Sequence, residues 1–155
     1  MGIANAVAFG ASVIQSAFCA PFFLAFVHKI YLEGMRMDRD HMGELLAPSI
    51  FLGRHTSVII LTRQGTSHPA ETLGPLQQHE YVWSHPTIRP FGVELPVQCP
   101  LCGSLASLRC RATEELVRVR CGSKNCSFVH TYSRPPGLTM IKSGEGGQWV
   151  ERFGT

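Results

Sequence analysis

Four cysteines in the last third of the chain have the spacing of two metal-binding turns. They form the pairs Cys99-x-x-Cys102 and Cys121-x4-Cys126, with a hairpin's length of chain between the pairs. Thiolates arranged in two such pairs bind zinc with tetrahedral geometry, and iron is the minor alternative. Four thiolates leave zinc no open coordination position, so the sequence predicts a structural Zn²⁺ and not a catalytic one.

The residues around these cysteines predict the elements that position them. Residues 104–111 and 116–121 alternate as strands joined by a turn at 112–115, and residues 128–132 supply a third short strand. Turn, hairpin, turn and strand follow one another in the order of a zinc ribbon. We therefore place a small β zinc ribbon at residues 97–140.

Positive charge is concentrated on this ribbon. Residues 99–155 carry eight Lys and Arg against four Asp and Glu, whereas residues 1–98 carry six against seven. Strand alternation places the ribbon's arginines on common faces, opposite Cys110. If the strand register joins these faces, they form a basic patch for a nucleic-acid backbone or another anion; a merely solvated face is the alternative. The patch comprises Arg109, Arg111, Arg118, Arg120 and Lys124.

Two interpretations of the N-terminus stay open, because residues 1–27 contain no Lys, Arg, Asp or Glu. In the first, residues 3–11 form a buried strand, and a helix then begins at Pro21 and ends at Gly34. In the second, residues 3–27 form a membrane or secretory segment. Polar residues interrupt the apolar run and no basic residue precedes it, which favours the first interpretation.

The following residues extend the first interpretation to an α/β fragment over residues 1–63, in the order strand, helix, helix, strand. Asp38 is positioned to cap the second helix, Pro48 to end it, and residues 56–62 to form a strand covered on both faces. The apolar positions of the second helix are Met42, Leu45 and Leu46. These few elements bury little surface. We therefore expect one of three arrangements: the ribbon covers the sheet, residues 1–63 are the tail of a larger α/β domain, or the chain forms an oligomer.

We predict an extended, Pro-rich connector at residues 64–96 and a Gly-rich C-terminal tail at residues 141–155. Five of the ten prolines fall in the connector. Tyr81, Trp83 and Phe91 also lie there, and we expect them to pack against the modules and not to form a binding platform.

Cysteines at metal-binding spacing indicate reduced thiols, and hence a cytoplasmic or nuclear protein. Cys19 is predicted to be a buried apolar residue, and neither Cys110 nor His130 has a chelating neighbour in the sequence. The chain contains no P-loop, dinucleotide-binding glycine motif, nucleophile elbow or His-Glu-x-x-His. We therefore predict a non-enzymatic protein that contacts nucleic acid or a protein partner.

Two resemblances add to these predictions. Most of the chain resembles the C-terminal part of uncharacterised proteins from mushroom-forming fungi. The resemblance rests on the ribbon and on Leu52-Gly-Arg-His-Thr-Ser-Val-Ile-Ile-Leu-Thr-Arg63, Val82-Trp-Ser-His85 and Arg89-Pro-Phe-Gly92. The segment Ala20-Pro-Phe-Phe-Leu-Ala-Phe26 is similar to the late helices of caspase-like CHAT domains. The second resemblance implies a truncated product or accessory subunit that starts after the catalytic His and Cys, carries no catalytic residue and docks onto a larger α/β protein.

Overall fold

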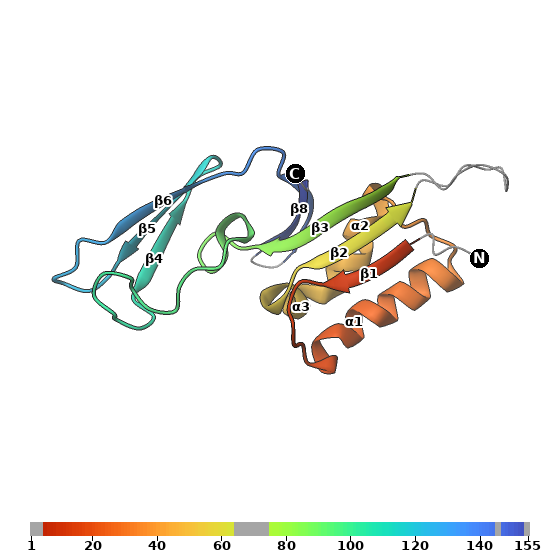
Figure 1. The fold of residues 1–155 in the computed structure, drawn as a ribbon, viewed down its shortest axis with the longest axis horizontal. Helices are drawn as coiled ribbons and strands as arrows, with labels where there is room; N and C mark the ends of the chain where they lie inside the picture. Colours follow the sequence, from red (N-terminus) through yellow and green to blue (C-terminus); the bar gives the residue numbers. More distant parts are fainter. Residues whose placement is uncertain (1–4, 64–74, 145–146, 154–155) are drawn as a thin grey trace. The chain divides into compact units, whose positions relative to one another are not determined.

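The computed structural model describes residues 5–63, 75–144 and 147–153 and divides the chain into two compact units (Figure 1). The first, here called the α/β unit, combines residues 1–83 with residues 139–155. The second, the ribbon unit, comprises residues 84–138. The described chain is thus a mixed α/β protein with one five-stranded and one three-stranded sheet.

The sheet of the α/β unit has the strand order β1-β2-β3-β8-β7. Strand β2 is antiparallel to both β1 and β3, and β7 and β8 form an antiparallel hairpin. The C-terminal hairpin therefore completes a sheet that the N-terminal half begins. The strands are β1 Asn5–Phe9, β2 Val58–Arg63, β3 Leu76–Ser84, β7 Thr139–Gly144 and β8 Gly147–Phe153.

Helical segments between β1 and β2 bury their apolar side chains against one face of this sheet. On the sheet side of the core, residues two apart along a strand point to the same face, as Val58 and Ile60 of β2 do. Phe22 and Leu52 contribute from the helices. The segments are α1 Ser16–Phe26, the π-helix η1 Val27–Leu32, α2 Arg39–Leu46, the 3₁₀-helix η2 Ala47–Ser49 and α3 Ile50–His55.

The predicted order of strand, helix, helix and strand is not confirmed, because a third α-helix, α3, precedes β2. Helix α1 also begins earlier than predicted, at Ser16, so Pro21 lies inside it. Cys19 and Phe22, three residues apart on one helical face, are both buried, and this burial offsets the cost of an internal proline. Gly34 has a φ of 70° after the helical segment, as a terminating glycine should.

Strand β2 differs from the prediction of a strand covered on both faces. Val58 and Ile60 are buried, but Ile59 and Leu61 on the opposite face are only half-buried. The helices cover one side of the sheet, and the β-branched run reflects strand propensity more than burial on two sides.

The predicted connector and tail contain strands. Residues 76–84 form β3, where Tyr81 and Trp83 are 2% and 1% exposed, so the prediction that these aromatics pack is confirmed. Strands β7 and β8 occupy most of the predicted tail, and Trp149 is buried in the core. Residues 64–74 of the connector lie outside the described residues, as do residues 3 and 4 of the predicted first strand.

The apolar N-terminal run forms β1 and α1. Helix α1 has 11 residues, whereas a helix needs about 20 to cross a bilayer. No helix among the described residues is long and apolar enough to span a membrane.

The second helix begins as predicted, at an aspartate cap. The carboxylate of Asp38 accepts a hydrogen bond from the backbone N–H of His41 at 3.2 Å. The three predicted apolar positions of α2, Met42, Leu45 and Leu46, are all buried.

Replacing Asp38 with alanine is expected to lower the free energy of unfolding by about 1 kcal/mol, because an N–H group of the first turn loses its acceptor. Asp38→Asn keeps an acceptor and is the matched control. A hydrogen bond from the His41 side chain lowers the pKa of Asp38 below its usual 3.8. The charge-dependent part of the stabilisation is therefore present above that pH and lost as the pH falls through the lowered pKa. Urea unfolding of the three proteins at pH 7 and near pH 3 measures both effects; equal stability of all three at pH 7 would contradict the cap.

Candidate metal centre and arginine face

The ribbon unit contains three antiparallel strands in the order β4-β5-β6. They are β4 Leu108–Ala112, β5 Leu116–Cys121 and β6 Val129–Ser133, in agreement with the predicted hairpin and third strand. Between β4 and β5, the N–H of Thr113 donates to the carbonyl of Leu116 at 2.8 Å, and its hydroxyl accepts from the Leu116 N–H at 3.1 Å. This tight turn fixes the register of the hairpin.

The four cysteines predicted as ligands lie together at one end of the ribbon. Their sulfur atoms are all within 4.8 Å of one another. The Sγ atoms of Cys99 and Cys126 are 3.7 Å apart, as are those of Cys102 and Cys121. Four sulfurs at tetrahedral corners, each 2.3 Å from a zinc ion, would be separated by about 3.8 Å. The cluster therefore fits a metal ion, and all four cysteines are free of disulfide bonds.

Backbone hydrogen bonds shape the first turn of the site. The N–H of Cys99 donates to the carbonyl of Ser104 at 3.0 Å, and the N–H of Gly103 donates to the carbonyl of Cys99 at 2.9 Å. Gly103 has a φ of 71°, a conformation that a residue with a Cβ rarely adopts. This glycine lets the chain reverse directly after Cys102.

The second turn places Cys121 and Cys126 in a similar way. The N–H of Ser123 points at the sulfur of Cys121 at 3.4 Å, and the N–H of Cys126 donates to the carbonyl of Ser123 at 3.1 Å. A backbone N–H aimed at sulfur favours the thiolate, which is the form that binds a metal.

Serine hydroxyls surround the sulfurs. The Oγ of Ser107 lies 3.2 Å from the sulfur of Cys121 and, with the Ser123 N–H, lowers the pKa of that thiol to about 6. The hydroxyl of Ser104 lies 3.2 Å from the sulfur of Cys102 and lowers its pKa as well. The N–H of Phe128 acts in the same direction on Cys126, but burial and the neighbouring thiols outweigh it and raise its pKa to about 12. Four adjacent thiols do not all ionise without a cation among them.

The other cysteines and the ribbon histidine lie outside this cluster. Cys19 is buried in the core of the α/β unit, as predicted. Cys110 pairs with Val119 on the face opposite the arginines, and burial raises the pKa of its thiol. The ring of His130 packs against Tyr132, with ring centroids 4.5 Å apart.

The strand register brings the four predicted ribbon arginines onto one face. Arg109 lies directly opposite Arg120, and Arg111 lies directly opposite Arg118. All four side chains are exposed, and none forms an ion pair with another described residue. We call these four residues the arginine face.

Lys124, the fifth predicted basic residue, lies in the turn between Cys121 and Cys126. It is exposed and belongs to no strand. The Arg109 side chain approaches this turn, since a Cβ on Gly122 would lie 3.6 Å from its Cγ. The lysine thus neighbours the metal turn, and the register does not place it on the arginine face.

The opposite face of the ribbon has a different character. Leu108, Val119 and Tyr132 point to that side, because they alternate with the arginine-face residues along the strands. They help to line a hollow of about 240 Å³, together with Pro96, Pro100, Phe128 and His130. The sheet therefore separates a basic face from an apolar and aromatic one.

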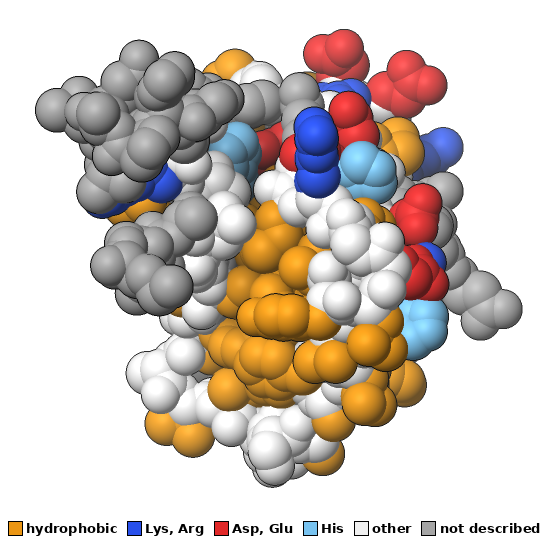
Figure 2. Space-filling model, turned by 90° about the vertical axis from the view of Figure 1, so that its right-hand side faces the viewer, with side chains coloured by type: hydrophobic (Ala, Val, Ile, Leu, Met, Phe, Trp, Pro, Cys, Tyr) orange, Lys and Arg blue, Asp and Glu red, His pale blue; other side chains and the backbone are white. Residues whose placement is uncertain are grey.

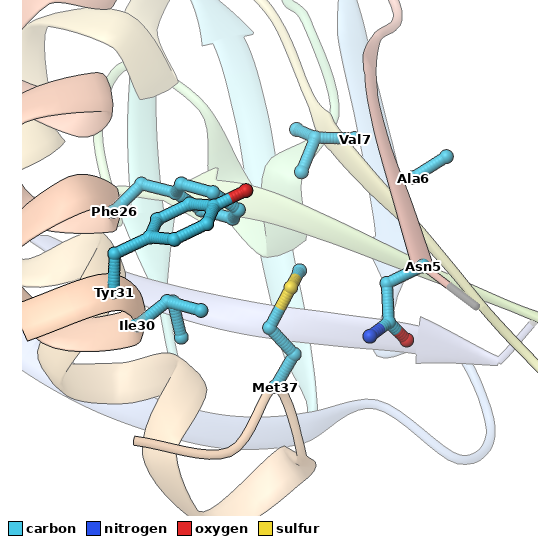
Figure 3. Close-up of a pocket in the computed structure, with 7 residues that line it drawn as sticks. All are labelled: Asn5, Ala6, Val7, Phe26, Ile30, Tyr31 and Met37. Atoms are coloured by element: carbon cyan, nitrogen blue, oxygen red, sulfur yellow. The ribbon is translucent and has the colours of Figure 1, made fainter. Parts of the chain in front are cut away.

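The α/β unit has an apolar groove of about 260 Å³ between β1 and the end of the helical segment α1–η1 (Figure 3). Phe26 and Ile30 line it from the helical side, and Val7 lines it from the strand. Hydrophobic side chains gather on the face of the molecule that Figure 2 shows. No cysteine, histidine or carboxylate is among the described residues that line the groove.

Comparisons with known proteins found no match: no family model, no curated protein and no solved structure matches the sequence. The candidate site is therefore interpreted from its own geometry.

Proposed function

We propose that the ribbon predicted at residues 97–140 is a structural zinc ribbon that ends at residue 138, where the ribbon unit ends and before β7 begins, and that the arginine face contacts nucleic acid. The role is non-enzymatic: the metal holds the two cysteine turns together, and the strands between them present the arginines. The tetrahedral spacing of the four sulfurs supports the metal half of this proposal. Zinc suits a closed four-thiolate site, and iron, the second candidate, would give the purified protein visible absorption.

The observation that supports nucleic-acid binding is the placement of arginines directly opposite each other on two neighbouring strands. Cross-strand pairs of equal charge destabilise a sheet, and this hairpin contains two of them, Arg109–Arg120 and Arg111–Arg118. A polyanion placed between the guanidinium groups would convert the repulsion into charge-assisted hydrogen bonds.

Replacing all four arginines of the face with glutamine is expected to weaken binding to short oligonucleotides at least tenfold. Four fewer cations in contact with phosphates should also flatten the dependence of log affinity on log salt concentration. Fluorescence anisotropy of labelled DNA, titrated with the zinc-loaded full chain at two salt concentrations, measures both effects.

Two single variants serve as a matched pair for this experiment. Arg111→Gln and Arg36→Gln change the net charge equally, but Arg36 is an exposed residue of the α/β unit. Only the first should weaken binding. If both weaken it equally, the binding reflects overall charge; if the zinc-loaded chain binds no oligonucleotide at low salt, the proposed function is wrong.

The alternative, a truncated remnant or accessory subunit of a caspase-like peptidase, stays a prediction from sequence resemblance. Under this alternative the α/β unit docks onto a larger α/β protein, whereas a nucleic-acid-binding protein makes its main contact through the ribbon.

A further inference from the structure

We infer that the ligand of the arginine face is the backbone of a double-stranded nucleic acid, bound without reading its bases. Each cross-strand arginine pair, Arg109–Arg120 and Arg111–Arg118, would hold one phosphate, and the two phosphates would be successive ones on the same strand. This inference rests on the proposed function and specifies its ligand.

The strand register sets the spacing of the guanidinium groups. Directly opposite residues of an antiparallel pair have Cβ atoms about 4.5–5.5 Å apart, so two arginines there can hold one phosphate between them. The two pairs are two residues apart along the strands, which separates them by roughly 6.5–7 Å. Successive phosphates of one nucleic-acid strand, joined through a sugar, lie at a comparable distance. Isolated anions would not require two such pairs.

The third strand indicates that the bases are not contacted. Arg120 pairs with Val129 and Arg118 pairs with Thr131, so the remaining side chains on this face are aliphatic or carry a hydroxyl. His130 and Tyr132 alternate with these residues and point to the opposite side of the sheet. Proteins that bind single strands stack bases on aromatic side chains, and the arginine face has none. A duplex, whose bases are already stacked on one another, needs only phosphate contacts.

The ribbon supplies no carboxylate partner for the four arginines. Glu114 and Glu115, the nearest acidic residues in the sequence, lie between β4 and β5 and form no ion pair with an arginine in the described structure. No carboxylate among the described residues therefore competes with a bound polyanion for these arginines. Arginine suits phosphate binding, because its planar fork donates two parallel hydrogen bonds to one phosphate.

The first experiment compares three probes against the zinc-loaded full chain at one ionic strength: a DNA duplex, one of its strands alone, and polyglutamate of the same charge. We expect the duplex to bind at least fivefold more tightly than the others, and a duplex of unrelated sequence to bind equally well. Equal or tighter binding of the single strand would overturn this inference and leave the proposed function standing. Equal binding of polyglutamate would indicate an acidic protein partner and overturn both, as would binding of none of the probes.

The second experiment tests whether each pair holds one phosphate, by double-mutant cycles on duplex binding. Arg109→Gln and Arg120→Gln should not be additive, because either change disrupts the same clamp. Arg109→Gln and Arg111→Gln affect different clamps and should be additive in log affinity. Additivity within the pair Arg109–Arg120 would overturn the paired arrangement.

Discussion

A serine in place of Cys121 is expected to release the metal and to unfold the three-stranded sheet of the ribbon unit. Cys121 is both a predicted ligand and the last residue of β5, the central strand of that sheet. Metal binding to four-ligand sites of this size contributes on the order of 10–16 kcal/mol, most of the folding energy of so small a sheet. Few buried apolar side chains compensate for its loss, since Val117 and Val119 are the only described members of β5 that are both aliphatic and buried.

Cys110→Ser is the matched control for this experiment. Cys110 lies on the neighbouring strand β4, outside the cluster of four sulfurs, so its replacement should leave the metal in place. Zinc per chain, measured by elemental analysis of the purified full chain, should fall well below one for Cys121→Ser and stay at one for Cys110→Ser. Treatment of the unchanged protein with a chelator should have the same effect as Cys121→Ser: it should remove the metal and the hydrogen-exchange protection of the ribbon's amide groups.

Two results would contradict a structural metal in the ribbon. If Cys121→Ser retains stoichiometric zinc and the exchange protection of β4–β6, the metal is bound elsewhere or the sheet does not depend on it. If the unchanged chain contains no metal but keeps its protected ribbon, the four thiols are structural without an ion.

The three-stranded sheet and the cysteine cluster could be predicted from the sequence because their determinants are local. The spacing of each cysteine pair, the turn at residues 112–115 and the alternation along β5 all lie within a few residues of the elements they specify. The predicted grouping of the arginines depended only on the register of one hairpin, and its short turn fixes that register. The same locality explains the correct prediction of the Asp38 cap.

The α/β unit was predicted less well because its sheet depends on distant segments. Strand β3 lies within the predicted connector, because prolines flank it and its partner β8 is far along the chain. Strand β8 begins at Gly147 within a Gly-rich stretch and lies within the predicted tail. A Cβ on Gly147 would lie 2.4 Å from the Trp83 ring, so the glycine allows β8 to pack closely against this ring. Because the two residues are far apart in the sequence, no local sequence pattern indicates their contact.

Alanine in place of His79 is expected to destabilise the α/β unit by about 2 kcal/mol. The Nδ1 atom of His79 lies 2.6 Å from a carboxylate oxygen of Glu151, and Glu151 is 0% exposed. The pair links β3 to β8, two neighbouring strands, through two residues that are 72 positions apart in the sequence. Glu151 is fully buried, whereas the His79 side chain is 26% exposed. Removing the imidazole takes one hydrogen-bond partner from the buried carboxyl group, which typically costs about 1–3 kcal/mol.

Urea unfolding of the full chain, followed by tryptophan fluorescence, measures this effect, because Trp83 and Trp149 are both buried in the same core. Gln78→Ala, at the exposed adjacent position of β3, should change the stability by less than about 0.5 kcal/mol. Replacing both partners with apolar residues, as in His79→Leu with Glu151→Met, should restore part of the stability lost in His79→Ala, because the buried carboxyl group is then removed together with its imidazole partner. If the double variant is less stable than His79→Ala, Glu151 stabilises the unit mainly through contacts other than the one with His79. The His79–Glu151 pair would then not be an important link between β3 and β8.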